Sequence, residues 1–418
     1  MSLRTIVWCW LLACTAVATG PQFVAGQPPP RLLTLDDALS LALMENATVR
    51  AKTFELQATR ANEITAGLRP NPSASYTAER FGAGSGSSLE HTATLAQTIE
   101  TGGKRRRRLD SARAASRVTA YELADVRRQV TFQVKKAFTD VLVARATLAL
   151  AEENLRTLDE LERIQRFRAE RGDISELELT RIQIQRFASE RDAADARQAM
   201  AAAKIALRAV MGPAASPADF DVTGDLAFRE VPLERDELVR ATLASRPDVL
   251  AAEAARTKAR ADVGLARANA WWDVTPLLEY KRTDTNEQTF GFGVSVPIRI
   301  FDRNQGEIAR TRAEVDRAEA QREAVVMQAL SEVDTALAAV QTQRQRIAAL
   351  RDTYLPKAEQ ARRTVEFAYR RGGFSLLDFL DAQRTYRETA LEYARAQGNY
   401  WTAIYQLEAA VGAPGGAK

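Results

Sequence analysis

The sequence is poor in the side chains that most catalytic and metal sites require. Its 418 residues contain two cysteines and one histidine, and both cysteines, Cys9 and Cys14, lie within the first fourteen positions. If that segment is removed on export, only His91 and at most one thiol are left. Zinc sites built from cysteine and histidine, catalysis by either residue and internal disulfides are therefore nearly all excluded. We expect no enzyme, no metal site and no cofactor.

Long hydrophobic runs and one-sided charge are also missing. Beyond the amino terminus no apolar stretch reaches the roughly 18 residues of a transmembrane helix, so a membrane role would have to use strands. The 58 basic and 54 acidic residues are mixed along the chain, and only Lys104 to Arg108 forms a dense basic run. Nucleic-acid binding gathers cations on one face, so we expect no nucleic-acid partner.

The first 26 residues are typical of an export signal. Arg4 supplies a positive flank, the stretch 6–18 is apolar, and Ala25-Gly26 gives a cleavage region of small residues. We therefore predict a signal peptide at 1–26. The run Leu11-Leu12-Ala13-Cys14 also resembles a lipoprotein processing site. Two fates stay open for Cys14, which are lipidation and removal with the signal.

The rest of the chain repeats one plan at an offset of 200 residues. The segment Arg171-Gly172-Asp173-Ile174-Ser175 corresponds to Arg371-Gly372-Gly373-Phe374-Ser375, and Met211-Gly212 corresponds to Val411-Gly412. A period this long indicates a duplicated domain and not a solenoid. The predicted organisation is a first repeat at 27–212, a linker at 213–232, a second repeat at 233–412 and a tail at 413–418.

Each repeat predicts a helix, two strands, a very long helix, a tight turn and a final helix. Residues 102–170 contain no proline and, after Gly103, no glycine, and their apolar side chains follow the three- and four-residue spacing of a coiled-coil seam. At its usual rise this helix would span about 100 Å. The seam positions in the two repeats are Val134, Ala137, Val141, Ala144, Leu148, Ala151, Leu155 and Leu158, and then Leu330, Val333, Leu337, Val340, Ile347, Leu350 and Tyr354.

Shorter helices can stack to match the long ones. The returning helices are predicted at 176–211 and 376–411, and two further helices at about 46–69 and 246–271. We expect 176–211 to stack end to end with 246–271, and 376–411 with 46–69, so that each composite column is as tall as a long helix. Periodicity alone also allows a helical hairpin in a soluble bundle.

Four segments of about ten residues predict strands, at 72–81, 89–99, 274–282 and 289–298. A tilted strand of that length crosses a bilayer. Four strands cannot close a barrel, and an open edge is not tolerated in hydrocarbon, so a membrane role requires several chains, and three would supply twelve strands. The last segment alternates small residues with Phe290, Phe292, Val294, Val296 and Ile298, as expected between lipid and water.

Several short motifs, in this order, resemble the TolC-type outer-membrane efflux family over nearly the whole mature chain. They are Arg69-Pro70-Asn71-Pro72, Glu100-Thr101-Gly102-Gly103-Lys104-Arg105, Val296-Pro297-Ile298 and Phe301-Asp302-Arg303-Asn304-Gln305-Gly306-Glu307. The second and fourth are more similar to the branch that exports cobalt, zinc, cadmium or copper than to the multidrug branch. The resemblance implies a mainly α fold with a small β part. In that fold long coiled-coil helices form a periplasmic α-barrel, and a trimer closes a 12-stranded transmembrane β-barrel from four strands per chain.

The resemblance also implies a function and partners. It places a homotrimer in the outer membrane of a Gram-negative bacterium, with a large periplasmic part docked to an adaptor protein and an inner-membrane proton-driven pump. The chain would be a passive exit duct for heavy-metal cations. Export of drugs or secreted polypeptides by the same architecture is an alternative. An exported coiled-coil scaffold that never inserts is a third hypothesis.

The same resemblance names candidate site residues. The turns at 171–175 and 371–375 would contact the adaptor and close the tube, with Ser175 and Ser375 as helix N-caps. Asp378 and Asp381 match the aspartate pair at the closed periplasmic entrance of TolC, and a trimer would make two carboxylate rings from them. The residues at the corresponding places of the first repeat are Glu178 and Arg181, which raises the option of a bridge from Arg181 to Asp378 or Asp381. Without the resemblance, solvated acids near a helix N-terminus would be the simpler interpretation.

Three smaller features each allow more than one interpretation. The run Lys104 to Arg108 begins a helix, where cations oppose the helix dipole, so it either contacts lipid phosphates or is simply solvated. Trp271 and Trp272 precede the third predicted strand and form either an interfacial belt or a buried pair. His91, in a predicted strand without cysteine neighbours, is expected to be structural.

Overall fold

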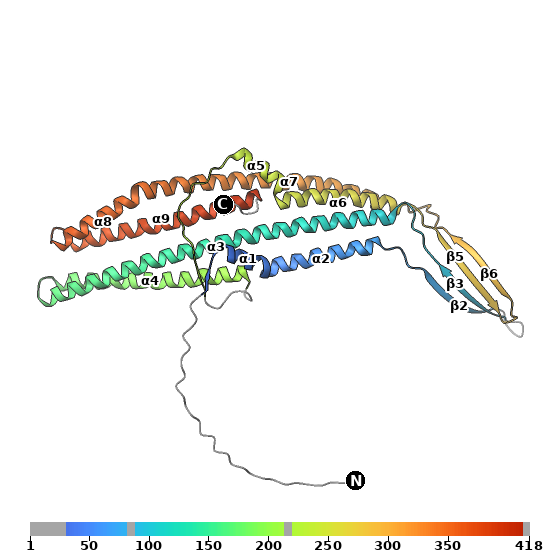
Figure 1. Cartoon of the computed structure of the whole chain (residues 1–418), viewed down its shortest axis with the longest axis horizontal. Helices are drawn as coiled ribbons and strands as arrows, with labels where there is room; N and C mark the ends of the chain where they lie inside the picture. The colour runs from blue at the N-terminus through green and yellow to red at the C-terminus, as the bar shows by residue number, and fades with distance from the viewer. Residues whose placement is uncertain (1–30, 82–87, 213–219, 413–418) are drawn as a thin grey trace, which may run out of the picture.

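The computed structural model describes residues 31–81, 88–212 and 220–412. The predicted signal peptide with Cys14, and the tail at 413–418, lie outside these residues. The described chain is an elongated bundle of helices with one antiparallel sheet at its end (Figure 1). Two helical hairpins point their turns toward the opposite end. None of the helices in the described ranges combines the length and apolar character that a membrane span needs.

The first repeat contains one helix of unusual length. Its elements in chain order are α1 (Leu35–Glu45), α2 (Ala47–Gly67), β2 (Ser73–Phe81), β3 (Ser88–Ala96), α3 (Lys104–Glu170) and α4 (Glu176–Met211). Helix α3 runs unbroken for 67 residues. Val134, Val141 and Leu158 on its seam are 1% exposed or less, so the apolar stripe is buried against neighbouring helices.

The second repeat follows the same order, but its long helix is interrupted. Its elements are α5 (Arg235–Ser245), α6 (Pro247–Asn269), β5 (Thr275–Thr283), β6 (Gln288–Ser295), α7 (Gln305–Ala349), the π-helical turn η1 (Leu350–Tyr354), α8 (Leu355–Arg370) and α9 (Leu376–Val411). Pro356 follows the π turn and lacks the amide that would continue the α-helical bonding. The π turn contains one residue more than an α turn and rotates the helix, so the prediction that Tyr354 lies on the seam is wrong. Its side chain is 60% exposed.

The composite columns form within each repeat, and the predicted pairing of shorter helices is wrong. The amide of Asn46, the N-cap of α2, donates to Val210 O near the end of α4 over 2.8 Å. The guanidinium of Arg246, the N-cap of α6, donates to Ala410 O near the end of α9 over 2.9 Å. Helix α4 therefore meets α2, and α9 meets α6 (Figure 1).

Glycine makes both junctions close enough for these bonds. At Gly212 (φ +102°) a Cβ would lie 3.0 Å from Glu45 O, and at Gly412 (φ +77°) it would lie 2.6 Å from the Cα of Arg246. Both backbones are also in the left-handed region, which glycine adopts at little cost. The same type of junction thus occurs in both repeats, between positions 46 and 212 in the first and between positions 246 and 412 in the second.

The sheet joins strands from both repeats in the antiparallel order β2-β3-β5-β6. Its central pair, β3 and β5, brings Leu95 opposite Leu278. Strands β2 and β6 are the edges and each has one unpaired side within the chain. The predicted strand at 289–298 ends early, at Ser295, since it has no partner beyond the edge and Pro297 cannot donate to a ladder. The predicted strand at 89–99 ends at Ala96, with Ile99 bridging to Val274.

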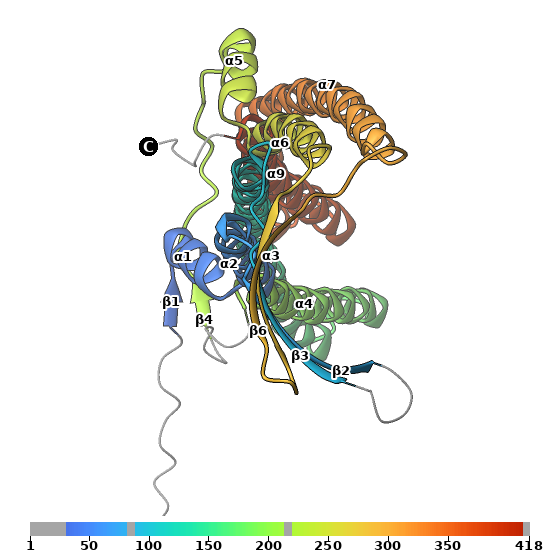
Figure 2. The same cartoon turned by 90° about the vertical axis from the view of Figure 1, so that its right-hand side faces the viewer.

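A small parallel pair lies halfway along the bundle. It joins β1 (Arg31–Leu33) to β4 (Phe220–Val222), and α1 lies beside it on one flank (Figure 2). Sequence analysis did not predict either strand, and β4 falls within the region expected to be a linker. Phe220 and Val222 are buried against α3, which fixes this connection to the bundle.

Candidate functional site

The two hairpin turns have nearly the same local structure. Gly172 (φ +78°) and Gly372 (φ +79°) adopt the left-handed conformation that ends each outgoing helix. Ser175 and Ser375 are the N-caps of α4 and α9. In each turn an arginine guanidinium lies 4.0 Å from the centre of a phenylalanine ring, in the pairs Arg171 with Phe167 and Arg371 with Phe367. The predicted tip residues are thus at the exposed end of the molecule opposite the sheet (Figure 1).

The two hairpins pack against each other behind their turns. The apolar contact consists of five buried residues, Leu158, Leu161, Ile182, Leu376 and Phe379. The amide of Gln165 on α3 donates to the hydroxyl of Tyr369 on α8 over 2.6 Å. Burial raises the pKa of the Tyr369 phenol, which therefore stays protonated at neutral pH. A groove of about 460 Å³ runs along this seam.

Asp378 takes part in a capping box at the start of α9. Its Oδ2 accepts hydrogen bonds from the Ser375 amide (3.0 Å) and hydroxyl (2.7 Å), and its own amide donates to the Ser375 hydroxyl over 3.2 Å. The hydrogen bonds from Ser375 hold the pKa of this carboxyl below its ordinary value. The side chain is exposed and ionised at neutral pH. The carboxylate is therefore charged and already held in position.

The other predicted gate residues do not meet within one chain. Asp381 is exposed and pairs with Arg384 on its own helix over 2.7 Å. Glu178 and Arg181 are exposed on α4 at the first turn, and no ion pair of either is found in the described part of the chain. The proposed bridge from Arg181 to Asp378 or Asp381 is absent from this single chain. Asp378 and Asp381 lie one turn apart on α9, and Glu178 and Arg181 lie one turn apart on α4.

Sequence analysis missed the polar residues buried between the hairpins. Asn154 on α3 donates to Ser189 on α4 over 2.9 Å within the first hairpin, and its side-chain oxygen accepts from Gln383 of the second hairpin over 3.5 Å. All three side chains are buried. Gln165 is only 3% exposed. The signal was present, because Gln165 falls where the three- and four-residue spacing of the α3 seam expects an apolar residue. A polar residue at a seam position indicates a specific partner across the interface.

The basic run at the start of α3 is a structural clamp. Lys104 is buried and pairs with Asp273 over 2.6 Å, at the start of β5. Arg105 donates to Gly67 O at the end of α2, and Arg108 donates to Ala66 O. These cations meet the negative end of the α2 dipole, which explains their place. Lys104 is buried, so the predictions of lipid contact and of plain solvation are both wrong for it, while contact of the exposed Arg105 with lipid phosphates stays a prediction.

The tryptophans next to this clamp are on the surface. Trp271 is 59% exposed and Trp272 is 46% exposed, so the interpretation as a buried pair is wrong. A Cβ on Gly102 would lie 2.8 Å from the Cβ of Trp271, so only glycine fits at the joint between helix and sheet. This joint leaves both rings at the height where strands begin.

The register of the sheet separates an apolar face from a polar one. Residues opposite each other in the ladders share a face. One face carries Ala74, Tyr76, Ala93, Leu95, Pro276, Leu278, Tyr280, Phe290, Phe292 and Val294. The other carries Ser75, Thr77, Glu79, Glu90, Thr92, Thr94, Glu279, Lys281, Gly291 and Gly293, with Ala96 and Leu277 at the end next to the helices. The alternation predicted for the last strand thus extends over all four.

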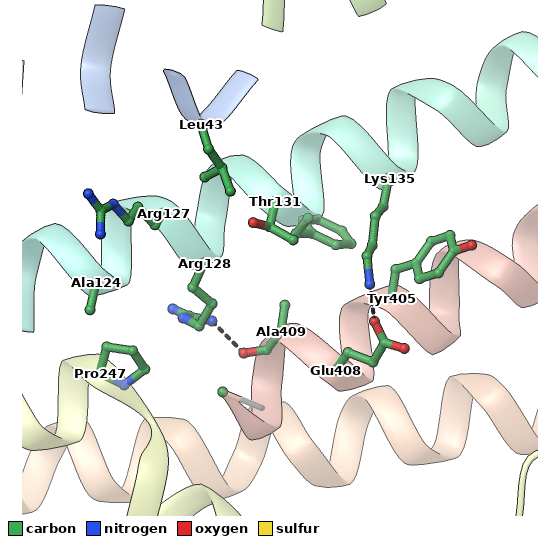
Figure 3. A pocket seen from close by; sticks show the side chains of 12 residues that line it. Leu43, Ala124, Arg127, Arg128, Thr131, Lys135, Pro247, Tyr405, Glu408 and Ala409 are labelled. Carbon is green, nitrogen blue, oxygen red and sulfur yellow. Dashed lines mark hydrogen bonds and ion pairs between the residues drawn. The ribbon is translucent and has the colours of Figure 1, made fainter. Parts of the chain in front are cut away.

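A pocket of about 290 Å³ lies at mid-height between α3 and the end of α9 (Figure 3). Arg128 donates to Ala409 O over 2.6 Å, and Lys135 pairs with Glu408 over 2.5 Å. Burial raises the pKa of Tyr405, beside Lys135, to about 12. These two contacts of Arg128 and Lys135 fix the end of α9. Among the described residues no group of three or more histidines, cysteines or acids is placed to hold a metal ion.

Two long hairpins from a duplicated repeat, with turns at one end and a four-stranded sheet at the other, define the class of outer-membrane channels. The solved structure of the CmeC outer membrane channel of Campylobacter jejuni has this fold, with a TM-score of 0.76, 17% identity, and coverage of 90% of this chain and 85% of that chain. The family model "Outer membrane efflux protein" matches residues 38–213 and 238–413. The chain therefore belongs to the outer membrane efflux protein family.

Two curated relatives resemble the chain over most of its length. The chain is 31% identical over 389 residues to the cobalt-zinc-cadmium resistance protein CzcC of Cupriavidus metallidurans, over 91% of this chain and 90% of the relative. It is 26% identical to the pyoverdine export outer membrane protein OpmQ of Pseudomonas putida, over 90% of this chain and 84% of the relative. The predicted family, the channel function and the outer-membrane location with a large periplasmic part are confirmed. Membership in a channel family favours the channel over the scaffold hypothesis.

Proposed function

We propose that this chain is the passive exit duct of a tripartite efflux system for heavy-metal cations. The observation that carries this proposal is its 31% identity, over 91% of the chain, to a cobalt-zinc-cadmium resistance protein. The chain performs no chemistry in this function, and an inner-membrane proton-driven pump supplies the energy. Metal ions are cargo that passes through.

The proposed assembly is a homotrimer. The sheet leaves β2 and β6 as open edges, and an open edge cannot face hydrocarbon because its amides lack partners. Pairing β6 of one chain with β2 of the next in three copies closes a 12-stranded barrel. Its apolar face is turned to lipid and its polar face to the lumen. The helices continue the tube into the periplasm, where the exposed turns at 171–175 and 371–375 contact the adaptor.

The proposed lumen suits cations. Its polar sheet face carries Glu79, Glu90 and Glu279 against the single Lys281, which pairs with Glu90 and with Glu279 over 3.1 Å. At the other end Asp378 and Asp381 of three chains would form two carboxylate rings. Such rings raise the local concentration of cations in a narrow passage. Glu178 and Arg181 line the same level on the first hairpin, where Arg181 lowers the net negative charge.

The gate proposal is tested in planar bilayers with neutralising substitutions. Asp378→Asn with Asp381→Asn removes the charge, while the amide oxygen introduced at position 378 can still accept the Ser375 bonds. We expect block by a trivalent cation to weaken at least about tenfold. The matched control is Asp173→Asn with Glu176→Gln at the first turn, which should leave block unchanged. Unaltered block in the first variant would remove both aspartates from this role.

The substrate proposal is tested in cells. A strain lacking this protein should become sensitive to cobalt, zinc, cadmium or copper and recover on complementation. Its sensitivity to drugs should not change. Drug sensitivity without metal sensitivity would favour the alternative, a channel of the same architecture for drugs or polypeptides. Because one relative is a pyoverdine export protein, export of a siderophore should also be measured in the same strains.

A further inference from the structure

The apolar face of the sheet ends in two arginines and a histidine at its loop end. Arg80, His91 and Arg282 share that face, because Ala78 is opposite His91 and His91 is opposite Arg282. His91 and Arg282 lie in the row directly after the one that contains Tyr76 and Tyr280, and Arg80 lies one row further, opposite Leu89. Arg80 and Arg282 are exposed, and Arg282 donates to the side chain of Asn286 in the adjoining turn. We call Arg80, His91 and Arg282 the outer rim.

Charge is sorted between the two faces at this height. Each outer-rim residue follows a charged residue that points to the polar face, in the pairs Glu79-Arg80, Glu90-His91 and Lys281-Arg282. In the described strands of this four-stranded sheet, all three glutamates lie on the polar face and both arginines lie on the apolar face. The carboxylate of Asp284, two residues after Arg282, accepts a bond from the Leu89 amide over 3.1 Å. The rim is therefore a positive surface at the border of an apolar one.

Plain solvation does not account for this arrangement. Cations that serve only solubility have no reason to stay on the apolar face while the acids occupy the other. The aromatic row below the rim, Tyr76, Tyr280 and Phe290, is the amphipathic belt that marks the edge of a hydrocarbon layer. The hydroxyl of Tyr76 forms a 2.6 Å hydrogen bond with Nδ1 of His91, so the belt and the rim are joined. In the barrel proposed above, this places the rim at headgroup height.

We propose that the outer rim binds the phosphate groups of a phosphorylated glycolipid in the outer leaflet of the membrane. This inference rests on the proposed trimeric barrel, which turns the apolar face toward lipid. Guanidinium groups bind phosphate through two parallel hydrogen bonds, and both arginines are exposed on the lipid-facing side of the sheet. Three chains would present six such arginines around the barrel. Lipid anchored there seals the outer end of the barrel against the bilayer.

The test uses the purified trimer in nanodiscs of neutral phospholipid with diphosphoryl lipid A or dephosphorylated lipid A added. Native mass spectrometry counts the bound lipid. We expect the wild-type trimer to retain the diphosphoryl form, and Arg80→Gln with Arg282→Gln to weaken that binding at least about tenfold. Arg80→Lys with Arg282→Lys should lie between the two. Excess inorganic phosphate should not displace the lipid, because the apolar face holds its acyl chains.

The matched control is Lys281→Gln, next to Arg282 but on the polar face. It should bind diphosphoryl lipid A as the wild type does. The inference is overturned if the double glutamine variant binds as tightly as the wild type, if Lys281→Gln loses binding equally, or if both lipid forms bind alike. Failure of the wild type to form a trimer would instead contradict the barrel itself. Trimer formation is read separately from the heat-dependent shift in gel migration.

Discussion

The two hairpins follow the same order of elements but differ in the continuity of their long helix. In the first, α3 is a single helix of 67 residues. In the second, the same course is divided into α7, the π turn at 350–354 and α8. A π turn followed by proline weakens the helical ladder at one place. We infer that the first hairpin is the stiff frame of the tube and that the second can bend between its tip and its middle.

The turns of the two hairpins also differ, in how their helices are capped. Both turns have a serine N-cap, but only Ser375 has a reciprocal carboxylate, that of Asp378. The aspartates proposed for the gate are thus on the hairpin that can bend. Both aspartates have their partners within the second hairpin, where Asp378 is bonded to Ser375 and Asp381 pairs with Arg384. A gate carried by the segmented hairpin against an unbroken one is the arrangement that this difference supports.

Proline introduced into the first hairpin tests its stiffness most directly. Arg156 corresponds to Pro356 in the repeat and is exposed, so its replacement disturbs little besides the backbone. Arg156→Pro should destabilise the protein by about 3 kcal/mol or more, because the amide bond is lost and the ring clashes with the preceding turn. The measurement is the thermal midpoint of the detergent-purified protein. Arg156→Ala is the control and should be nearly neutral.

Pro356→Ala is the reverse substitution, and it should be tolerated since the site already accepts a break. If proline at 156 were tolerated as well as it is at 356, the stiff and segmented hairpins would be equivalent and the contrast would be lost.

The two mid-height junctions differ in how much their N-cap residues, Arg246 and Asn46, stabilise the folded protein. Arg246 is 2% exposed and pairs with Asp248 over 2.8 Å and with Glu332 over 2.6 Å. Arg246→Ala removes both ion pairs and the bond to Ala410 O, and because the carboxylates left behind are 28% and 40% exposed it should cost about 2 kcal/mol. Asn46→Ala removes a neutral N-cap and should cost about 1 kcal/mol. Thermal midpoints of the two variants and of the double variant check the order, and equal losses would contradict it.

The periodic parts of this fold could be predicted from the sequence, and the parts that depend on contacts without a periodic pattern could not. The seam of α3 could be read because three- and four-residue spacing maps directly onto one helix face. The stacking of shorter helices could not, since α4 is long enough to meet either α2 or α6, and the choice rests on contacts made by Asn46 and Arg246. The π turn was missed because the spacing from Leu350 to Tyr354 still looked α-helical.

The candidate site was predictable to a similar extent. The turns repeat a motif and could be placed by their glycines and serines, and the two aspartates by the resemblance. The bond from Gln165 to Tyr369 joins residues 204 positions apart, which no local pattern reports. The same holds for Lys104, whose partner Asp273 belongs to the other repeat.

A smaller change loosens the contact between the hairpins. Tyr369→Phe keeps the ring that stacks on Phe379, with centroids 5.3 Å apart, and removes the hydroxyl that accepts from Gln165. Because the Gln165 amide is buried, its lost partner should cost about 1 to 2 kcal/mol. We expect a lower thermal midpoint and more frequent openings in planar bilayers. Tyr354→Phe, on the exposed π turn, is the control.

Openings without a change in thermal midpoint would mean that the hydroxyl acts on the gate alone. No change in either quantity would show that the hairpins do not depend on this bond.

The smallest expected effect is a difference between the two turns in how their order depends on pH. The pKa of Asp378 is lowered by its hydrogen bonds from Ser375. A carboxyl with a depressed folded-state pKa stabilises the fold above its ordinary unfolded value, and that contribution is lost as pH falls through the folded value. Between neutral pH and about pH 4 the second tip should therefore keep its capping box, and in stronger acid it should fray. The first tip has no such box and should lack this transition. Limited digestion with pepsin from about pH 4 down to about pH 2 should then show cleavage near 371–375 rising more steeply than near 171–175, and Asp378→Asn should abolish the difference. Parallel rises at both turns would mean that the box contributes nothing to the order of the second tip.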